Sequence, residues 1–439
     1  MESWPETGVD APSDPVTGAL EALCDLVRPI RRGRVASYIP EIARADPDQF
    51  GVALVSLVGH TYKAGDATVP ITLQSISKPF VFALALADEG LDGMLARVGA
   101  EPSGEAFNAI SLDPQSGRPA NPMINAGAIV TTSIVRARNP TARFERIHRA
   151  LSAFAGRELD VDEAVYRSEL ATGDRNRALA YLMRNAGSLE GEVDEVLDVY
   201  FRQCAVLVTA CDIAVMAATL ANGGRNPVTG EQVVDETVAE QTCAVMTSCG
   251  MYDYAGEWLV RVGLPAKSGV TGGLMAVSPG QFGVGMFSPP LDERGNSVRS
   301  VEASKVLADR FSLQLVHRTS PTPPVCYLDL RRGEREGALA TALGLQGDLD
   351  FTAAEIVLVV VDRIRREHPA IRWLVMDLER VSRLRLGAAA MLGAMVRDLG
   401  GQGVEVVVAD PLARSLVPDA PDAPSVAAAV ERAVRGPDV

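Results

Sequence analysis

The chain has 439 residues, of which 47% are hydrophobic, and its formal net charge at pH 7 is −14. This length exceeds that of one average domain, so we expect two. The negative charge argues against a surface for nucleic acid or anionic membranes, because nothing there would neutralise the phosphates. Residues 1–14 lack the basic start and apolar run of a signal peptide, which indicates a cytoplasmic protein.

The first predicted domain comprises residues 15–312. Its elements in chain order are a helix over 15–32, strands over 51–59 and 69–73, a helix that begins near Ser75, helical patterns throughout 125–250, and strands over 269–276 and 281–288. The turn-rich residues 63–66 are expected to connect the first two strands. Strands near both ends of a region that encloses helices predict an antiparallel sheet completed by distant segments. This is an α+β architecture with a helical subdomain.

A proline-rich linker is predicted at residues 313–324, followed by a second domain at residues 325–439. Its predicted elements are a strand over 325–330, a helix over 352–367, a strand over 373–378, a helix over 387–399, a strand over 404–409 and a helix over 425–434. This alternation is typical of a small α/β domain.

Only four lysines occur among the 42 basic residues, and two of them belong to short signatures. Lys78 ends a Ser-x-x-Lys sequence that starts at Ser75, and Lys267 begins a Lys-Ser-Gly sequence. Arginine keeps its proton near neutral pH, whereas a lysine amine desolvated beside another cation can act as a base. The two signatures therefore suggest a hydrolase with a serine nucleophile and a lysine base.

Hydrolysis of an amide through a serine needs a base, a proton for the leaving amine and a site for the oxyanion. Ser75 and Lys78 are three residues apart at a predicted helix start, so they should share one face, where the helix N-terminus favours negative charge. We expect Lys267 to lie nearby and to hold down the pKa of Lys78, so that Lys78 can accept the Ser75 proton. Backbone N–H groups at the Lys-Ser-Gly strand could share the oxyanion.

Other catalytic classes have less support in the sequence. The four histidines, His60, His148, His317 and His368, are scattered, which favours neither a metal site nor a Ser-His-Asp triad. We expect no metal and no organic cofactor. The Ser-Asp-Asn element of β-lactamases is absent between the two signatures, which points away from antibiotic hydrolysis.

A series of longer motifs follows in order along the first domain. They are Ala-Ser-Tyr-Ile-Pro at 36–40, Leu-Gln-Ser-Ile-Ser-Lys-Pro at 73–79, Glu-Pro-Ser-Gly at 101–104, Asn-Pro-Met-Ile-Asn-Ala-Gly-Ala at 121–128, Thr-Gly-Asp-Arg-Asn at 172–176, Asp-Val-Tyr-Phe at 198–201, Cys-Gly-Met-Tyr-Asp at 249–253 and Leu-Pro-Ala-Lys-Ser-Gly-Val at 264–270. With these motifs the chain from about residue 38 to 304 resembles the serine-dependent glutaminases, bacterial and mitochondrial. The resemblance implies hydrolysis of L-glutamine to L-glutamate and ammonia, a β-lactamase-like fold, and a homodimer or homotetramer.

The resemblance also implies roles for individual residues. Ser75 would be the nucleophile, Lys78 its base and Tyr252 the hydroxyl that relays a proton to the leaving ammonia, with Lys267 close to them. The N–H groups of Ser75 and Val270 would form the oxyanion hole. The implied substrate-binding residues are Tyr38, Ser75, Asn125, Glu169, Asn176, Tyr200, Tyr252 and Val270. A carboxylate such as Glu169 suits the ammonium of a free amino acid, and amides and hydroxyls suit its neutral and acidic groups. Asp174 and Arg175 are instead expected to form a structural ion pair.

From about residue 325 onward the chain resembles a STAS domain, on Leu-Val-Met-Asp-Leu at 374–378, Ala-Ala-Ala-Met-Leu at 388–392 and the sequence at 400–408. Residues 385–388 replace the Asp-Ser-Ser-Gly loop of that family, so its phosphorylatable serine is missing. A docking or oligomerisation module with a possible protein partner is the favoured interpretation.

Two alternatives to a glutaminase remain open from the residues. One is a penicillin-interacting serine hydrolase or β-lactamase, which would need export. The other is a catalytically inactive glutamine-sensing scaffold that acts through the STAS-like part, and the intact Ser75, Lys78 and Lys267 argue against it.

Overall fold

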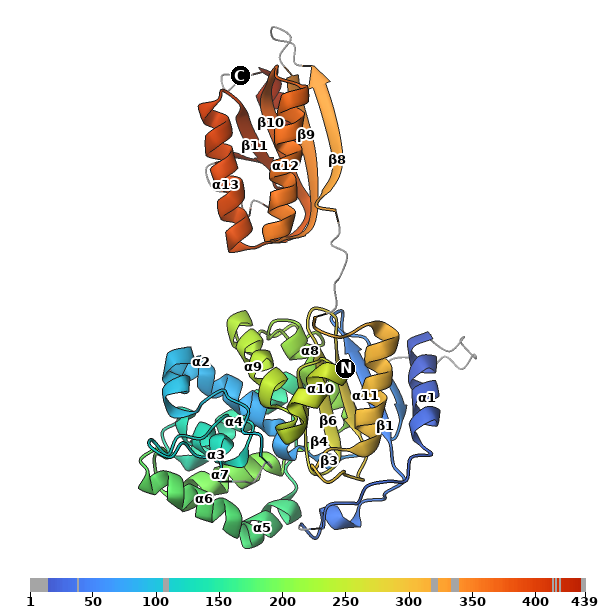
Figure 1. Ribbon diagram of the computed structural model, residues 1–439, viewed down its shortest axis with the longest axis vertical. Helices are drawn as coiled ribbons and strands as arrows, with labels where there is room; N and C mark the ends of the chain where they lie inside the picture. Colours follow the sequence, from blue (N-terminus) through green and yellow to red (C-terminus); the bar gives the residue numbers. More distant parts are fainter. Residues whose placement is uncertain are drawn as a thin grey trace. The chain divides into compact units, whose positions relative to one another are not determined.

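The computed structural model describes residues 15–435, except 38, 106–109, 317–322, 333–338, 413, 415–416 and 418–419. The chain divides into two compact units, Met1–His317 and Arg318–Val439 (Figure 1). The division falls within the predicted linker, although residues 317–322 of that linker lie outside the described residues.

The first unit contains an antiparallel sheet with the strand order β2-β1-β7-β6-β5. Its strands are β1 (Gly51–Ser56), β2 (Thr61–Gly65), β5 (Ala266–Ser268), β6 (Gly273–Ser278) and β7 (Phe282–Phe287). Gly51 of β1 pairs with Phe287 of β7, more than 200 residues away in the sequence. The expectation that distant segments complete one antiparallel sheet is confirmed.

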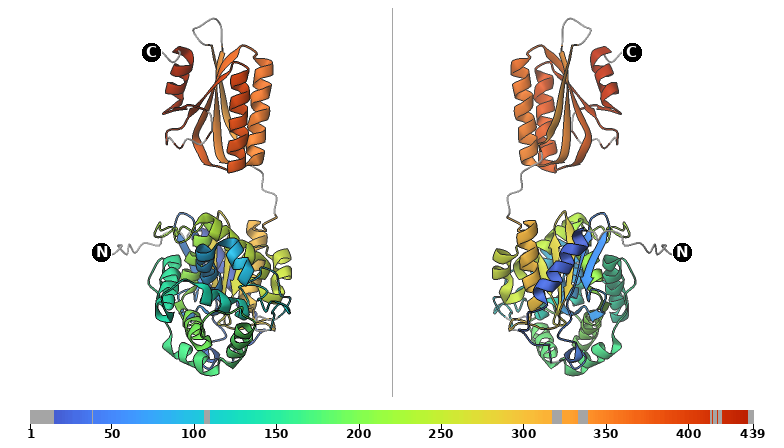
Figure 2. Two further views of the ribbon diagram at one scale, coloured as in Figure 1. Left: turned by 90° about the vertical axis from the view of Figure 1, so that its left-hand side faces the viewer. Right: turned by 90° about the vertical axis from the view of Figure 1, so that its right-hand side faces the viewer.

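Helices cover both faces of this sheet. On one face lie α1 (Pro15–Val27) and α11 (Val298–Phe311), whose apolar side chains share a core with Val52 and Leu54; Figure 2 shows α1 in front of the strands. On the other face lies α8 (Ala210–Ala221). A Cβ at Gly283 or Gly285 would lie 2.1 Å from an α8 backbone atom, so the glycines of β7 permit this close approach.

The helical part of this unit lies beside the sheet (Figure 1). It comprises α2 (Ser77–Arg97), α3 (Asn125–Ile134), α4 (Pro140–Ala155), α5 (Glu163–Thr172), α6 (Asp174–Asn185), α7 (Val193–Cys204) and α9 (Glu236–Cys249), followed by the short η3 (Tyr252–Tyr254) and α10 (Ala255–Arg261). Side chains from α2, α3, α4 and α7 form its core, with Phe80 against Phe154.

Two local predictions in this unit are wrong. Residues 63–66 are not a turn between strands, because Thr61–Gly65 forms β2 and the hairpin turn lies at residues 57–60, where Gly59 has a φ of 85°. The predicted strand at 69–73 shrinks to β3 (Ile71–Thr72), paired with β4 (Leu207–Val208) in a separate small sheet. Gly59, with its positive φ, is the glycine of the hairpin turn, whereas Gly65, with a φ of 64°, is the last residue of β2.

The second unit contains the sheet order β12-β11-β10-β9-β8, parallel except for β8. Its strands are β8 (Val325–Arg332), β9 (Leu339–Leu349), β10 (Ile371–Leu384), β11 (Glu405–Ala409) and β12 (Asp422–Ala423). Helices α12 (Phe351–Glu367) and α13 (Leu386–Gly401) pack on one face, and α14 (Val426–Arg435) packs on the other (Figure 2).

Strand β9 was not among the predicted elements. It carries Gly344, and a Cβ there would lie 2.1 Å from the ring of Tyr327, which crosses it to donate a hydrogen bond to Asp377. Glycine weakens the strand signal. Among the described residues of both units, none of the helices combines the length and apolar character that a membrane span needs.

Candidate active site

The sequence predicted Ser75 in the first turn of an α-helix. It lies instead in a strained turn just before that helix. Residues Gln74–Ile76 form the 3-10 helix η2, and α2 begins only at Ser77. Gln74 has a φ of 48°, a left-handed conformation that costs a non-glycine residue about 1–3 kcal/mol. Its carbonyl accepts a hydrogen bond from the Ser77 hydroxyl at 2.8 Å. The turn therefore holds Ser75 in a fixed position immediately before the helix.

Ser75 lines a cavity of about 370 Å³. Six of the predicted residues line it together: Ser75, Asn125, Glu169, Asn176, Tyr200 and Val270. They come from η2, α3, α5, α6, α7 and the loop between β5 and β6. The volume suits a small polar molecule. Tyr38 lies outside the described residues.

Lys78 is buried next to this cavity, with 1% of its surface exposed. Its Nζ donates hydrogen bonds to Asn125 Oδ1 at 2.7 Å and to the Met123 carbonyl at 3.3 Å. Burial lowers the pKa of Lys78 to about 7, against the opposing charges of Cys204 and Glu169. A substantial fraction of the amine is thus unprotonated at neutral pH, as a general base requires.

Lys267 is fully buried as well, and its Nζ donates to the carbonyl of Ser268 at 2.8 Å. Burial and the charge of Lys78 together lower its pKa well below the usual value. Repulsion between two ammonium groups acts on both of them, so the expectation that Lys267 affects the pKa of Lys78 stays a prediction. At both lysines burial is the largest cause of the lowered pKa.

Tyr252 contacts both amines and the serine. Its ring centre lies 3.8 Å from Lys267 Nζ and 5.9 Å from Lys78 Nζ. Its hydroxyl donates to the Ser268 carbonyl at 3.3 Å. Burial raises the pKa of Tyr252, and a side-chain hydrogen bond with Ser75 acts in the opposite direction. Like Gln74, it has a positive φ, of 56°.

Within the described residues, the Ser75 hydroxyl and the Lys78 amine form no direct hydrogen bond. Tyr252 contacts both side chains, and Asn125 accepts from Lys78 while it lines the cavity with Ser75. Catalytic hydrogen bonds are often loose without substrate. The Ser75 hydroxyl and the Lys78 amine are nevertheless connected through Tyr252 and Asn125.

The remaining polar residues of the cavity form a second cluster. Burial raises the pKa of Glu169 to about 7, while the hydrogen bond from the Gln74 amide and the charge of Lys78 oppose the rise. Asn125 Nδ2 donates to Asn176 Oδ1 at 3.0 Å. Tyr200 is buried, which raises its pKa well above the usual value. The cluster offers a carboxylate, two amides and a hydroxyl to one ligand.

The backbone N–H groups of Ser75 and Val270 donate to no acceptor in the part of the chain that the structure describes. Both residues are buried, with 7% and 4% of their surfaces exposed. Buried N–H groups in proteins are nearly always paired. Two such groups on one cavity are therefore suited to a developing oxyanion.

Sequence reasoning assigned no site role to seven residues that line the cavity, among them Gln74, Arg175 and Cys204. Gln74 donates to Glu169, Cys204 lies one turn after Tyr200 on α7, and Arg175 faces the cavity although a structural ion pair was expected. The Asp174 carboxylate lies 3.5 Å from the guanidinium of Arg177. Gln74 directly precedes Ser75, and that adjacency was the available signal.

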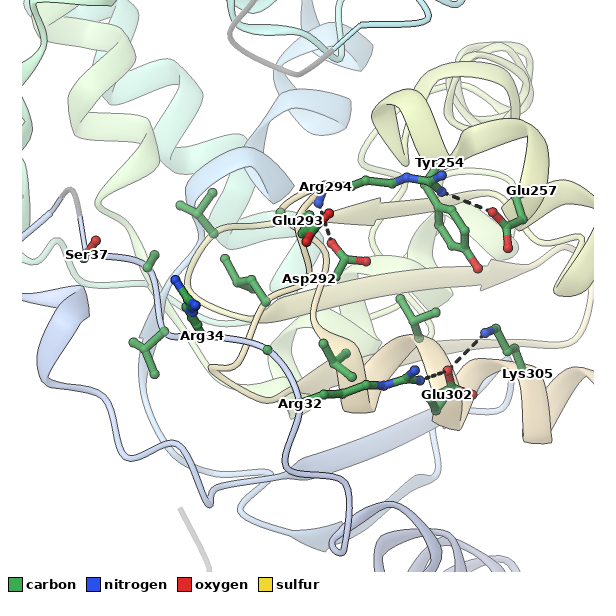
Figure 3. Close-up of a pocket in the computed structure, with 18 residues that line it drawn as sticks. Arg32, Arg34, Ser37, Tyr254, Glu257, Asp292, Glu293, Arg294, Glu302 and Lys305 are labelled. Carbon is green, nitrogen blue, oxygen red and sulfur yellow. Dashed lines mark hydrogen bonds and ion pairs between the residues drawn. The ribbon is translucent and has the colours of Figure 1, made fainter.

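A larger hollow of about 970 Å³ lies on the other side of Val270 (Figure 3). Arg32, Glu302 and Lys305 form an ionic cluster there, so Lys305 is not simply solvated as a lone lysine would be. Arg294 pairs with Glu257 at 3.1 Å. The charged side chains that line this larger hollow mostly pair with one another. Of the predicted site residues that the structure describes, Val270 alone is part of its lining. The smaller cavity is therefore the candidate active site.

No group of three or more histidine, cysteine, aspartate or glutamate side chains in the described residues could hold a metal ion.

A buried serine on a polar cavity, with two buried lysines and a tyrosine beside it, is an arrangement that suits a hydrolase. A sequence profile of the family described as Glutaminase matches residues 33–316. The chain belongs to the glutaminase family.

Relatives with assigned names agree with this family. Glutaminase 2 of Bradyrhizobium diazoefficiens is 48% identical over 393 residues, which cover 86% of this chain and 62% of that protein. The glutaminase of Corynebacterium glutamicum is 43% identical over 399 residues, which cover 90% of this chain and 94% of that protein. The chain thus spans less than two thirds of the first relative and nearly all of the second.

A solved structure described as Mglu in its glutamate form is similar over both units. It is 40% identical, its TM-score is 0.83, and the match covers 91% of this chain and 99% of that one. The mixed α/β architecture is therefore shared with a crystal structure.

Proposed function

We propose that this protein hydrolyses L-glutamine to L-glutamate and ammonia through an acyl-enzyme on Ser75. The observation that supports this most strongly is the pair of fully buried lysines around the Tyr252 ring, beside a serine on a small polar cavity. The relatives named above are glutaminases, and the Mglu structure is described in a glutamate form.

In the proposed acylation step, Lys78 in its neutral form accepts the Ser75 proton and Ser75 Oγ attacks the side-chain carboxamide carbon. The resulting oxyanion is bound by the free N–H groups of Ser75 and Val270. Collapse of the adduct breaks the C–N bond, and a proton delivered through Tyr252 leaves with the nitrogen as ammonia. The product is an ester between Ser75 and a glutamyl group.

In the proposed deacylation step, water attacks the ester carbonyl while Lys78 again accepts a proton. Ser75 Oγ recovers its proton as the C–O bond breaks, and glutamate leaves. Burial and the charge of Lys78 lower the pKa of Lys267 well below its usual value, so its neutral form is favoured. Its role would be to hold Tyr252 and the Ser268 carbonyl in place.

The substrate's α-ammonium is assigned to Glu169, whose burial makes an unpaired negative charge costly. Asn125, Asn176 and Tyr200 supply neutral donors and acceptors for its carboxylate and amide. Tyr38 is carried over from the family motif only.

Ammonia release from L-glutamine by wild type, Ser75→Ala and Lys78→Met tests this function. Each variant should lose at least about a hundredfold in kcat, the typical loss on removing a nucleophile or base. Lys63→Ala, an exposed lysine on β2, is the control and should keep full activity. Full activity of Ser75→Ala would end the mechanism, and hydrolysis of nitrocefin by wild type would favour the penicillin-interacting alternative.

For the architecture, we propose that the first unit has a β-lactamase-like fold and that the second unit is STAS-like. The two layers of helices around an antiparallel sheet support the former. For the latter, support comes from parallel strands with α12 and α13 on one face and α14 on the other. The second unit would be a docking or oligomerisation module in a cytoplasmic homodimer or homotetramer.

Light scattering on the full chain and on residues 1–317 tests the second unit's part in assembly. If the module mediates oligomerisation, the shorter chain should have a smaller subunit number at equal concentration. An unchanged subunit number would leave docking of another protein as its role, and a monomeric full chain would contradict the proposed oligomer.

A further inference from the structure

Asn121 holds a buried turn directly behind the proposed base. Only 1% of its surface is exposed. Its Oδ1 accepts hydrogen bonds from the backbone N–H groups of Met123 at 3.0 Å and Ile124 at 3.2 Å. Its Nδ2 donates to the Glu101 carbonyl at 2.8 Å. One side chain thus fixes the turn at residues 121–124 and ties it to a neighbouring segment.

This turn presents both acceptors of the Lys78 amine. The Met123 carbonyl accepts from Nζ directly, and Asn125, whose Oδ1 is the second acceptor, is the first residue of α3 after the turn. The turn is also sterically locked, because a Cβ at Gly127 would lie 1.8 Å from the Asn121 carbonyl oxygen. Any displacement of the turn would move both acceptors.

We propose that Asn121 is a positioning residue for the general base, acting on Lys78 through Met123 and Asn125 without contact with the substrate. This inference rests on the proposed function insofar as Lys78 is taken as the base. Its physical basis is that a buried amine with a long side chain keeps one position only if its acceptors are fixed. None of the residues predicted from the sequence has this role.

The chain offers a matched control in a second turn of the same design. Asn226 is fully buried and also precedes a proline, and its Oδ1 accepts from Val228 N at 2.8 Å and Thr229 N at 3.2 Å. Its Nδ2 donates to the carbonyls of Ala153 and Phe154. Within the described residues, no lysine donates a hydrogen bond to this turn. Equal substitutions at the two asparagines separate loss of the turn from loss of the base's acceptors.

The first experiment measures steady-state ammonia release and thermal stability for Asn121→Ala, Asn121→Asp, Asn226→Ala and wild type. Asn121→Ala should lose about tenfold to a hundredfold in kcat with KM changed less than about threefold, since it affects proton transfer more than binding. Asn226→Ala should lose a similar amount of stability but keep its kcat. Asn121→Asp keeps the Oδ1 acceptor and should recover most of the lost kcat when kcat is measured above the Lys78 pKa, which the added carboxylate raises. Equal kcat losses in the two alanine variants, or none in Asn121→Ala, would overturn the proposal, as would an aspartate variant no better than alanine.

The second experiment does not depend on activity. Because the chain has only four lysines, selective ¹³C labelling of lysine gives four ε-methylene signals, which a Lys78→Met variant assigns. The Lys78 amine faces Glu169 on α5, Cys204 on α7, Lys267 on β5 and Tyr252 on η3, and none of these is altered in the variants.

We expect Asn121→Ala to change the shift and titration of the Lys78 signal and to leave Lys63 and Lys305 unaffected. The added carboxylate in Asn121→Asp should raise the Lys78 pKa, because a nearby negative charge favours the ammonium form. A folded Asn121→Ala protein with an unchanged Lys78 titration would overturn the proposal. If wild type released no ammonia from glutamine, the proposed function would fail, and this titration would still decide whether Asn121 positions the lysine.

Discussion

The Lys267 amine lies 3.8 Å from the centre of the Tyr252 ring, in a site where neither side chain is more than 5% exposed. The contact joins the ring face and not the hydroxyl, which instead donates to the Ser268 carbonyl. Ring and hydroxyl can therefore be separated experimentally. The ring packs against the lysines, and the hydroxyl is the part available for proton transfer.

Tyr252→Phe should lower kcat by about a hundredfold to a thousandfold while KM changes less than about threefold. The ring and its packing against Lys267 remain, but the hydroxyl that would deliver a proton to ammonia is gone. Thermal unfolding should stay within a few degrees of wild type, because the ring and its packing are kept and the hydrogen bond from the hydroxyl to the Ser268 carbonyl is long, at 3.3 Å. Tyr254→Phe, in the same short helix η3, is the control. An unchanged kcat would remove Tyr252 from the proton relay.

The activity of wild type should fall as the pH drops below about 7. Lys78 must be neutral to act as the base, and burial lowers its pKa to about 7. Glu169 must be ionised to bind an ammonium, and burial raises its pKa to about 7. Both requirements fail on the acid side, so kcat/KM should decline there with a slope steeper than one proton. Since the two groups interact, the profile reports the pair and not either residue alone. A profile that is flat from pH 6 to 8 would contradict this reading.

Glu169→Gln should separate the two ionisations. The substitution removes the carboxylate that would pair with the substrate ammonium. KM should therefore rise at least about thirtyfold, as expected for an ionic contact worth about 2 kcal/mol. The Glu169 charge also raises the pKa of Lys78, so without it the remaining acid limb of kcat should move to lower pH. Full pH profiles of kcat and KM measure both effects. A limb displaced to higher pH would mean that Glu169 does not act on Lys78 as a negative charge.

The sequence predicted the side chains of the site better than their backbone. Ser75 and Lys78 follow from a motif whose chemistry is evident from residue type, whereas Glu169 and Asn176 came from the family resemblance. Ser75, Glu169 and Asn176 line one cavity, and Lys78 lies beside it. The left-handed φ of Gln74 could not be foreseen, because an isolated glutamine has no preference for it. Only the surrounding packing, with Ser77 bonded to the Gln74 carbonyl, imposes that conformation.

The electrostatics of the two lysines were also only partly predictable. Their proximity could be inferred from the paired signatures, but the lowered pKa of each depends first on how deeply the fold buries it. Lys78 has two acceptors and Lys267 has one carbonyl. The Met123 carbonyl comes from a turn 45 residues away, and nothing in the residue type of Met123 indicates it. Backbone acceptors of this kind leave no signal in a single sequence.

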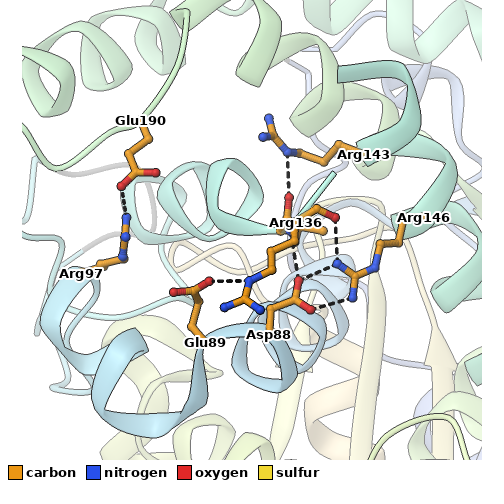
Figure 4. Close-up of polar contacts among 8 residues, drawn as sticks. Asp88, Glu89, Arg97, Arg136, Arg143, Arg146 and Glu190 are labelled. Atoms are coloured by element: carbon orange, nitrogen blue, oxygen red, sulfur yellow. Dashed lines mark hydrogen bonds and ion pairs between the residues drawn. The ribbon is translucent and has the colours of Figure 1, made fainter. Parts of the chain in front are cut away.

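Asp88 holds the first part of α2, the helix that carries Lys78, close to where Gly90 interrupts it (Figure 4). Asp88 accepts two hydrogen bonds from the Arg146 guanidinium, at 2.5 and 2.7 Å, and one from the Arg136 backbone N–H at 3.0 Å. Its side chain is only 10% exposed. Immediately beyond it, Gly90 breaks the regular helix with a φ of 72°. The Asp88 carboxylate thus ties the part of α2 before Gly90 to α4 through Arg146 and to the segment before α4 through Arg136.

Asp88→Asn should lower the free energy of unfolding by about 1–3 kcal/mol, because it leaves a partly buried guanidinium without its counter-charge. Burial alone would raise the pKa of Asp88, but hydrogen bonds from Arg146 and Arg136 and their charges lower it overall. A carboxylate with a lowered folded pKa contributes stability that is complete above its ordinary value of 3.8 and is lost as the pH falls through the folded value. Urea denaturation at several pH values should therefore show a difference in the free energy of unfolding between wild type and variant at pH 7, and a smaller difference below about pH 4.

Glu190→Gln is the control. The side chain of Glu190 is 62% exposed and that of its partner Arg97 is 36% exposed, so this pair should contribute about 0–1 kcal/mol. Equal effects of the two substitutions would mean that Asp88 is no more than a surface charge, and that α2 is held by its apolar face alone.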